Sequence, residues 1–159
     1  MDISERTLEI LEEAGWYEGR RIDITEMVHN LEKSGFVVFD AAKRFMEEFG
    51  ELKLENRRVL PDGTILYGRT ETINVNCTEW LELERNNLDK YLDERTIYMG
   101  NMGSGELFFY ITESGKFITP IGFKGNDPWE FWENVFFRKT SMTWEAYYDK
   151  YNLIPYWKK

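Results

Sequence analysis

Few residues in this sequence carry chemistry that could support catalysis. His29 is the single histidine, so any serine–histidine or cysteine–histidine catalysis would have to use it. It falls in a short predicted helix without an acid–base pattern around it, which favours a partly exposed structural histidine. Cys77 is the single cysteine, so it forms neither an intramolecular disulfide nor a thiolate zinc site, and a reducing compartment fits. Asp-x-Asp spacing is absent, so we expect no metal and no other cofactor.

A glycine-rich segment, residues 100–105, has the spacing G-x-x-G-x-G. This spacing is the reverse of the dinucleotide-binding fingerprint, and no Gly-Lys-Ser/Thr follows it. Because the segment leads into a predicted strand, no helix N-terminus is placed to hold a phosphate, and we expect a hairpin loop. Ser104 is not in a G-x-S-x-G elbow, since Met102 occupies the place of the first glycine. The sequence therefore predicts a protein that is not an enzyme.

The sharpest pattern of charge lies on a predicted helix from Glu79 to about Asp93. Its apolar side chains fall on one side at the helical period, and acidic side chains recur on the opposite side at three- and four-residue steps. No basic residue lies inside this acidic face, although Arg85 and Lys90 flank it. A solvated outer face is the ordinary interpretation of such a helix. The alternative is a surface for a basic protein partner, and its candidate residues are Glu79, Glu82, Asp89 and Asp93.

The balance of charge is acidic: 159 residues include 20 Lys and Arg against 29 Asp and Glu, a net charge of −9. Attraction to phosphates is the main sequence-independent source of nucleic-acid affinity, so direct nucleic-acid binding is disfavoured. No apolar run is long enough to span a membrane, and the N-terminus lacks the basic and apolar regions of a signal peptide. We therefore expect a soluble, cytoplasmic protein, and the length predicts a single domain, residues 1–159.

The elements that position these residues are organised around an apolar strand, residues 107–111. A strand without a polar face is expected to be covered on both sides. Turn residues precede and follow it, so antiparallel neighbours are expected at 96–99 and 116–121.

An alternating strand is also predicted from Leu52, and the turn at 61–63 connects it to the next strand. In this next strand Ile65 and Tyr67 share one face with Ile73 and Val75. Arg69 and Glu71 interrupt that face, so we expect a bend or bulge near Gly68.

Helices are predicted before, between and after the strands, so the expected class is α+β. Their approximate ranges are 4–14, 23–34, 40–50 and 79–93, with two more that begin near 127 and 143. Ser4 and Asp40 are expected to cap their helices, Asp23 to start the second one, and Pro128 to occupy a first helical position. Eleven of the 26 aromatic residues lie in the last 32 positions, which predicts a C-terminal region packed onto the sheet. One or two exposed aromatics there are candidate interface anchors.

Three segments resemble the third group of the SUKH (SMI1/KNR4-like) superfamily, the immunity proteins of bacterial polymorphic toxin systems. Residues 14–16, Ala-Gly-Trp, with Gly19-Arg20 are similar to the N-terminal Gly-Trp…Gly-Arg pattern of this group. Residues 41–50 form a helix that ends in Phe-Gly and runs into the strand at 52–54. Residues 105–115, Gly-Glu-Leu-Phe-Phe-Tyr-Ile-Thr-Glu-Ser-Gly, match the strand–turn–strand signature of the group. The aromatic C-terminus has no counterpart in this pattern.

The resemblance implies one α+β domain, with a mostly antiparallel or mixed sheet and helices packed around it. It also implies a cytosolic, non-enzymatic protein that binds and neutralises a cognate toxin, often a nuclease. Such a toxin would have a basic surface that binds phosphates, and the acidic face would bind to that surface in place of the phosphates. The alternative is a general protein-interaction or regulatory module of the same fold. The resemblance identifies no residue of the binding surface and leaves the oligomeric state open.

Overall fold

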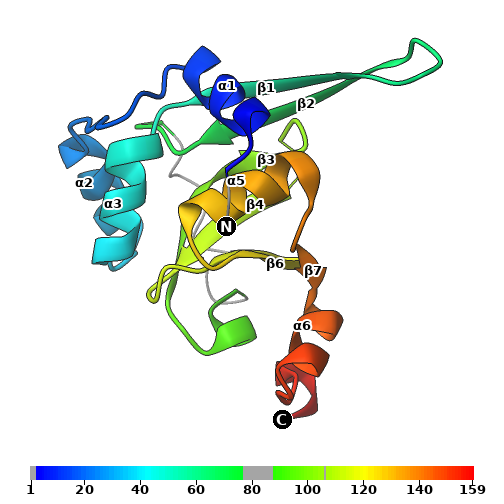
Figure 1. Cartoon of the computed structure of the whole chain (residues 1–159). Helices are drawn as coiled ribbons and strands as arrows, with labels where there is room; N and C mark the ends of the chain where they lie inside the picture. Colours follow the sequence, from blue (N-terminus) through cyan, green and yellow to red (C-terminus); the bar gives the residue numbers. More distant parts are fainter. Residues whose placement is uncertain (1–2, 77–87, 106) are drawn as a thin grey trace.

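The computed structural model describes residues 3–76, 88–105 and 107–159 (Figure 1). Within this part of the chain, seven strands form one sheet whose spatial order is their order along the chain. All neighbouring pairs are antiparallel. The strands are β1 (Lys53–Val59), β2 (Ile65–Thr72), β3 (Thr96–Met102), β4 (Leu107–Thr112), β5 (Phe117–Thr119), β6 (Gly122–Gly125) and β7 (Met142–Thr143).

Helices lie before, within and after the strand sequence and pack around the sheet, which confirms the predicted α+β class with an antiparallel sheet. They are α1 (Glu5–Glu13), α2 (Thr25–Lys33), α3 (Asp40–Phe49), α5 (Pro128–Phe137), α6 (Trp144–Lys150) and the 3₁₀ turn η1 (Tyr156–Lys158). Residues 88–92 are also helical. Helix α1 contacts β1 and α5, α3 contacts β3 and β4, and α5 lies along β6 (Figure 1).

Strand β4 is an interior strand, as its apolar sequence predicts. It pairs with β3 on one side, through Ile97 and Ile111, and with β5 on the other, through Ile111 and Phe117. On the helix-covered face, the ring of Phe109 lies 4.5 Å from Phe131 of α5, between centroids. On the opposite face, the ring of Tyr110 lies 5.9 Å from that of Tyr98. Side chains of β4 are therefore buried on both faces of the sheet.

In the described sheet the register shifts in β3 and again in β5, between Phe117 and Ile118, so the bulge predicted near Gly68 is wrong. Pairing between β1 and β2 continues without a break through the pair Asn56–Gly68. The register instead shifts between Tyr98 and Gly100, where β3 pairs with β4. A Cβ atom at Gly100 would lie 2.2 Å from the carbonyl oxygen of Glu71. The close approach of β2 to β3 thus requires glycine at this position.

The N-terminal segment with the Gly-Trp…Gly-Arg pattern has a structural role. The Trp16 ring stacks on Phe49 at the end of α3, at 6.4 Å, and meets Trp129 edge-on at 5.4 Å. Arg20 donates hydrogen bonds to the carbonyl oxygens of Glu48, at 2.6 Å, and Gly50, at 2.8 Å. These carbonyls belong to the last turn of α3, where helical partners are missing. The motif therefore fixes α1 and the end of α3 against each other.

Two helices begin where the sequence predicts. Ser4 caps α1, with its Oγ accepting from the backbone N–H of Thr7. Asp127 caps α5, and Pro128 is the first helical residue.

Two other helix starts are displaced by one or two residues. Helix α2 begins at Thr25, because Asp23 Oδ1 accepts from the N–H and the hydroxyl of Thr25 and holds a turn before the helix. Asp40 is the first residue of α3 rather than its cap, and Phe39 occupies the cap position.

The C-terminal region packs against the end of the sheet, as predicted. Trp144 Nε1 donates to the carbonyl oxygen of Thr119, at 2.9 Å, and Tyr148 donates its hydroxyl to the carbonyl oxygen of Tyr91, at 2.6 Å. Trp144 also stacks on Tyr91 at 4.5 Å. Tyr151 and Trp157 remain exposed at the outer side of this cluster.

Candidate partner-binding site

The β1–β2 hairpin projects beyond the helices (Figure 1). Its turn is the predicted one: the N–H of Gly63 donates to the carbonyl oxygen of Leu60, and Gly63 has a φ of 88°. Ile65 and Tyr67, which are expected to share a face with Ile73, are exposed whereas Ile73 is buried, because the hairpin extends past the core. Tyr67 is 69% exposed, and its exposed apolar neighbours are Val59, Ile65 and Leu66. Exposed apolar side chains on a projecting element, here on both faces of the hairpin, are typical of a protein-binding surface.

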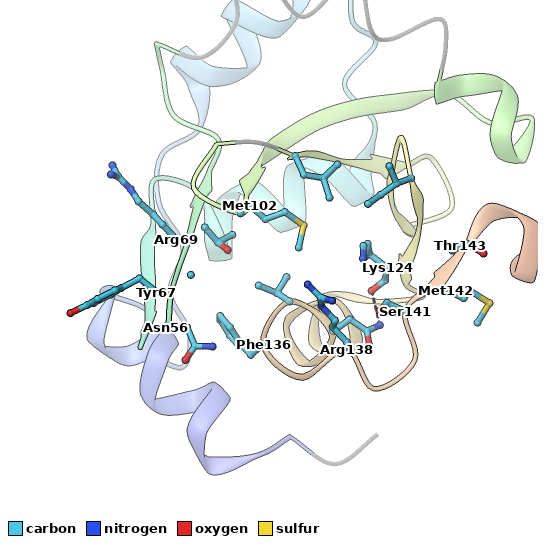
Figure 2. A pocket seen from close by; sticks show the side chains of 17 residues that line it. Asn56, Tyr67, Arg69, Met102, Lys124, Phe136, Arg138, Ser141, Met142 and Thr143 are labelled. Carbon is cyan, nitrogen blue, oxygen red and sulfur yellow. Dashed lines mark hydrogen bonds between the residues drawn. The ribbon is translucent and has the colours of Figure 1, made fainter. Parts of the chain in front are cut away.

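A pocket of about 510 Å³ lies between this hairpin and the C-terminal end of α5 (Figure 2). Strands β2 and β6 contribute Thr70 and Lys124, and the end of α5 contributes Phe136. Met102 and Leu107 line it from the ends of β3 and β4. The wall therefore combines apolar and polar side chains and is assembled from segments that are far apart in the sequence.

Two cationic side chains point into this pocket. Figure 2 shows Lys124 of β6 and Arg138, the residue that follows α5, directed toward the same space, whereas Arg69 is directed away from it. Arg69 forms an ion pair with Glu71. Burial, and then the charge of Arg138, lower the pKa of Lys124 below its ordinary value. No acidic residue is among the described residues that line the pocket.

The predicted acidic face lies only partly within the described residues. Glu79 and Glu82 fall outside them. Asp89 is half-buried, and its Oδ1 accepts from the N–H and the hydroxyl of Thr96, at 2.9 and 2.6 Å, so this carboxylate also holds the start of β3. Asp93 is exposed, directly after the helical residues 88–92, with a left-handed φ of 56°. The face remains a prediction as a partner-binding surface.

The two described residues considered for catalysis, His29 and Ser104, lie on separate elements. His29 is exposed on α2, and Ser104 lies in the turn between β3 and β4. This turn is residues 103–105, whereas residues 100–102 of the expected loop belong to β3. Among the described residues, no group of three His, Cys, Asp or Glu is placed to hold a metal ion. Cys77 lies outside these residues. Across the described part of the chain, none of the helices has the length and apolarity needed to cross a membrane.

Sequence reasoning missed both the projecting hairpin surface and the pocket. The alternation of Ile65 and Tyr67 indicates a strand but does not show whether a core lies beside it. Lys124 and Arg138 are separated in sequence by the whole of α5, and no local pattern shows that their side chains meet. Only the three-dimensional arrangement brings them to one pocket.

The sequence model of the SUKH-3 immunity protein family matches residues 3–136 of this chain. The match includes β1 to β6 and nearly all of α5, together with the segments 14–20, 41–54 and 105–115. Strand β7, α6 and the C-terminal aromatic cluster lie beyond it. No curated protein and no solved structure matches the chain.

Proposed function

The chain belongs to the SUKH-3 immunity protein family, and we propose that it protects its cell by binding one cognate toxin domain. The family match over residues 3–136 carries this proposal, since it spans most of the chain and supports a toxin-immunity role. Immunity of this kind needs a specific contact surface and no reaction, so we propose that the protein is not an enzyme. We further propose that it meets its toxin in the cytoplasm.

We propose that the toxin domain is a nuclease with a basic groove. The net charge of −9 would attract such a partner over a distance and raise its association rate. Carboxylates placed in the groove would then exclude the phosphates of the substrate. The acidic face with Glu79, Glu82, Asp89 and Asp93 is the proposed contact.

The contacts of α1 make it a weaker candidate for the same role. Arg6 lies 3.2 Å from the carboxylate of Glu9 and 3.9 Å from that of Glu13, so the acidic side of α1 is partly neutralised. The exposed apolar residues of the β1–β2 hairpin provide a second contact area, which adds buried surface to an interface steered by charge.

Co-expression tests the proposed role directly. The reading frame beside the gene is expected to encode a protein with a toxic C-terminal domain. That domain should kill cells when expressed alone, and co-expression of this chain should restore growth. Purified chain should also bind a catalytically inactive form of the toxin. Equal killing with and without the chain would overturn the proposal, and would favour a general interaction module with another partner.

A further inference from the structure

We propose that the pocket between the β1–β2 hairpin and the end of α5 binds an oxyanion, with a carboxylate or phosphate group held between Lys124 and Arg138. The site is a property of the free chain, so it does not depend on the toxin. Arg138 lies beyond the residues that the family model matches. The site therefore belongs to this chain and is not implied by its family.

The first argument is the convergence of like charges. Lys124 and Arg138 are directed into one space (Figure 2), and among the described residues neither has a carboxylate partner within ion-pair distance. Two cations that face each other in a partly buried pocket repel, and an anion between them converts that repulsion into attraction. Within the described part of this acidic chain, two converging cations without a carboxylate have the charge arrangement of an anion site.

The second argument is that the fold holds the backbone segments from which both cations project. Asn134 is buried in α5, and its Nδ2 donates to the carbonyl oxygen of Lys124, at 2.8 Å, and to the hydroxyl of Thr140, at 2.9 Å. Its Oδ1 accepts from the backbone N–H of Thr140, at 2.7 Å. One side chain thus fixes the backbone of β6 to the loop that contains Arg138. Backbone that is ordered before binding loses little entropy when a ligand arrives.

The third argument concerns the rest of the ligand. A volume of about 510 Å³ is much larger than a single phosphate or carboxylate needs. Apolar side chains line much of the remaining wall, among them Met102, Leu107, Val135 and Phe136, beside polar ones such as Thr70 and Ser141. The ligand is therefore an oxyanion carried on an apolar body, either an acidic segment of the partner protein or a free organic acid or phosphate ester.

Binding of inorganic phosphate and phenyl phosphate to the purified full chain tests the site, by calorimetry and by NMR. We expect saturable binding of phenyl phosphate, with weaker binding of inorganic phosphate because it lacks the apolar body. Lys124→Gln and Arg138→Gln should each weaken phenyl phosphate binding by about tenfold or more, the loss of one charge-assisted hydrogen bond. The matched control is Arg69→Gln, which removes a charge from the same pocket lining but from a side chain directed away; it should change affinity less than about twofold.

The proposal is overturned if wild-type chain binds neither compound saturably, or if Lys124→Gln and Arg138→Gln bind phenyl phosphate as tightly as wild type. Circular dichroism and urea unfolding confirm that each variant is folded before binding is compared. Once binding is established, an inactive toxin domain distinguishes the two sources of the anion. Competition between toxin and phenyl phosphate assigns the site to an acidic segment of the toxin. Simultaneous binding assigns it to a free small molecule.

Discussion

Glu133 Oε1 accepts hydrogen bonds from the backbone N–H and the hydroxyl of Ser4, at 2.9 and 3.0 Å, and joins the middle of α5 to the cap of α1. Its Oε2 lies 2.7 Å from Lys139 Nζ. The side chain of Glu133 is completely buried, whereas Lys139 is about half exposed. A buried carboxylate is costly unless it is paired and hydrogen-bonded, and here it is both. This contact therefore joins α1, near the N-terminus, to α5, which follows β6 in the sequence.

Glu133 should make the stability of the protein depend on acid pH. Burial alone would raise the pKa of Glu133, but Lys139 and the hydrogen bonds from Ser4 and Thr7 outweigh it and lower this pKa to about 2. A folded pKa below the ordinary value of 4.5 stabilises the protein above that value, and the stabilisation is lost as pH falls from there toward 2. We expect a loss on the order of 2 kcal/mol in urea unfolding across this window. Glu133→Gln should lack this acid-dependent loss, and an unchanged profile would contradict the assignment.

Gly100→Ala should destabilise the fold strongly. The added Cβ would lie 2.2 Å from the carbonyl oxygen of Glu71 and 2.7 Å from the Phe109 ring, so β2 and β4 would both have to shift. We expect a loss of about 2 kcal/mol or more in the free energy of unfolding. Gly68→Ala is the matched control, since its nearest contact would be an ordinary 3.8 Å from the carbonyl oxygen of Asn56. Equal losses in the two variants would show that the close approach at β3 is not the cause.

Arg20 and Arg21 are adjacent but should differ greatly in their effect on stability. Arg20→Met removes two hydrogen bonds to carbonyls of the last turn of α3, and should cost about 2 kcal/mol. Arg21 is 81% exposed and pairs with Glu47 at the surface, so Arg21→Met should cost less than about 1 kcal/mol. Thermal and urea unfolding of both variants provide the comparison. If both variants lose a similarly small amount of unfolding free energy, Arg20 does not stabilise the end of α3 by capping it.

Removing the charges of the proposed acidic face should weaken toxin binding. The variant Glu79→Gln, Glu82→Gln, Asp89→Asn and Asp93→Asn should bind with lower affinity and with a flatter dependence on salt, because rim charges act through attraction that salt screens. Asn at position 89 keeps an oxygen that can accept from Thr96, so the fold should be retained. The control replaces Glu5, Glu9, Glu12 and Glu13 of α1 by Gln. If the first variant binds the toxin with unchanged affinity at both low and high salt, the acidic face is a solvated surface that does not contact the toxin.

Apolar residues of the projecting hairpin should contribute affinity that salt does not screen. Leu66→Ser with Tyr67→Ser should weaken toxin binding by about tenfold at high salt, as the loss of an interface anchor does. Both side chains are exposed, so urea unfolding should barely change. Val37→Ser, at an equally exposed apolar residue outside the hairpin, is the control. If the hairpin variant binds the toxin as tightly as the wild-type chain and the Val37→Ser control, the hairpin is not part of the interface.

Prediction from the sequence is most accurate for structural features that depend on neighbouring residues in the chain. The apolar run at 107–111, its turn residues and the caps at Ser4 and Asp127 each depend on a few neighbouring residues, and all are found in the structure. The start of α2 is displaced because Asp23 bonds to Thr25 in a turn, which competes with a helix cap at short range. The same residue type supports both structures, so its identity alone does not decide between them.

Prediction from the sequence fails for features that depend on a contact with a residue from another part of the chain. Gly100 is required by Glu71 and Phe109, and neither is near it in the sequence. The burial of Glu133 depends on Ser4, which lies 129 residues away. The pocket depends on the meeting of Lys124 and Arg138, and the exposure of Tyr67 depends on where the core ends. In each case the residue type is compatible with several environments.

The order of the strands also bears on how the chain acquires its structure during synthesis. Each strand pairs with the strand made just before it, so the sheet can extend as the chain leaves the ribosome, without waiting for a later segment to insert. The partner of Ser4 is different, because Glu133 emerges only after β6. Helix α1 must therefore remain without its hydrogen bonds to Glu133 until β1 to β6 have been synthesised.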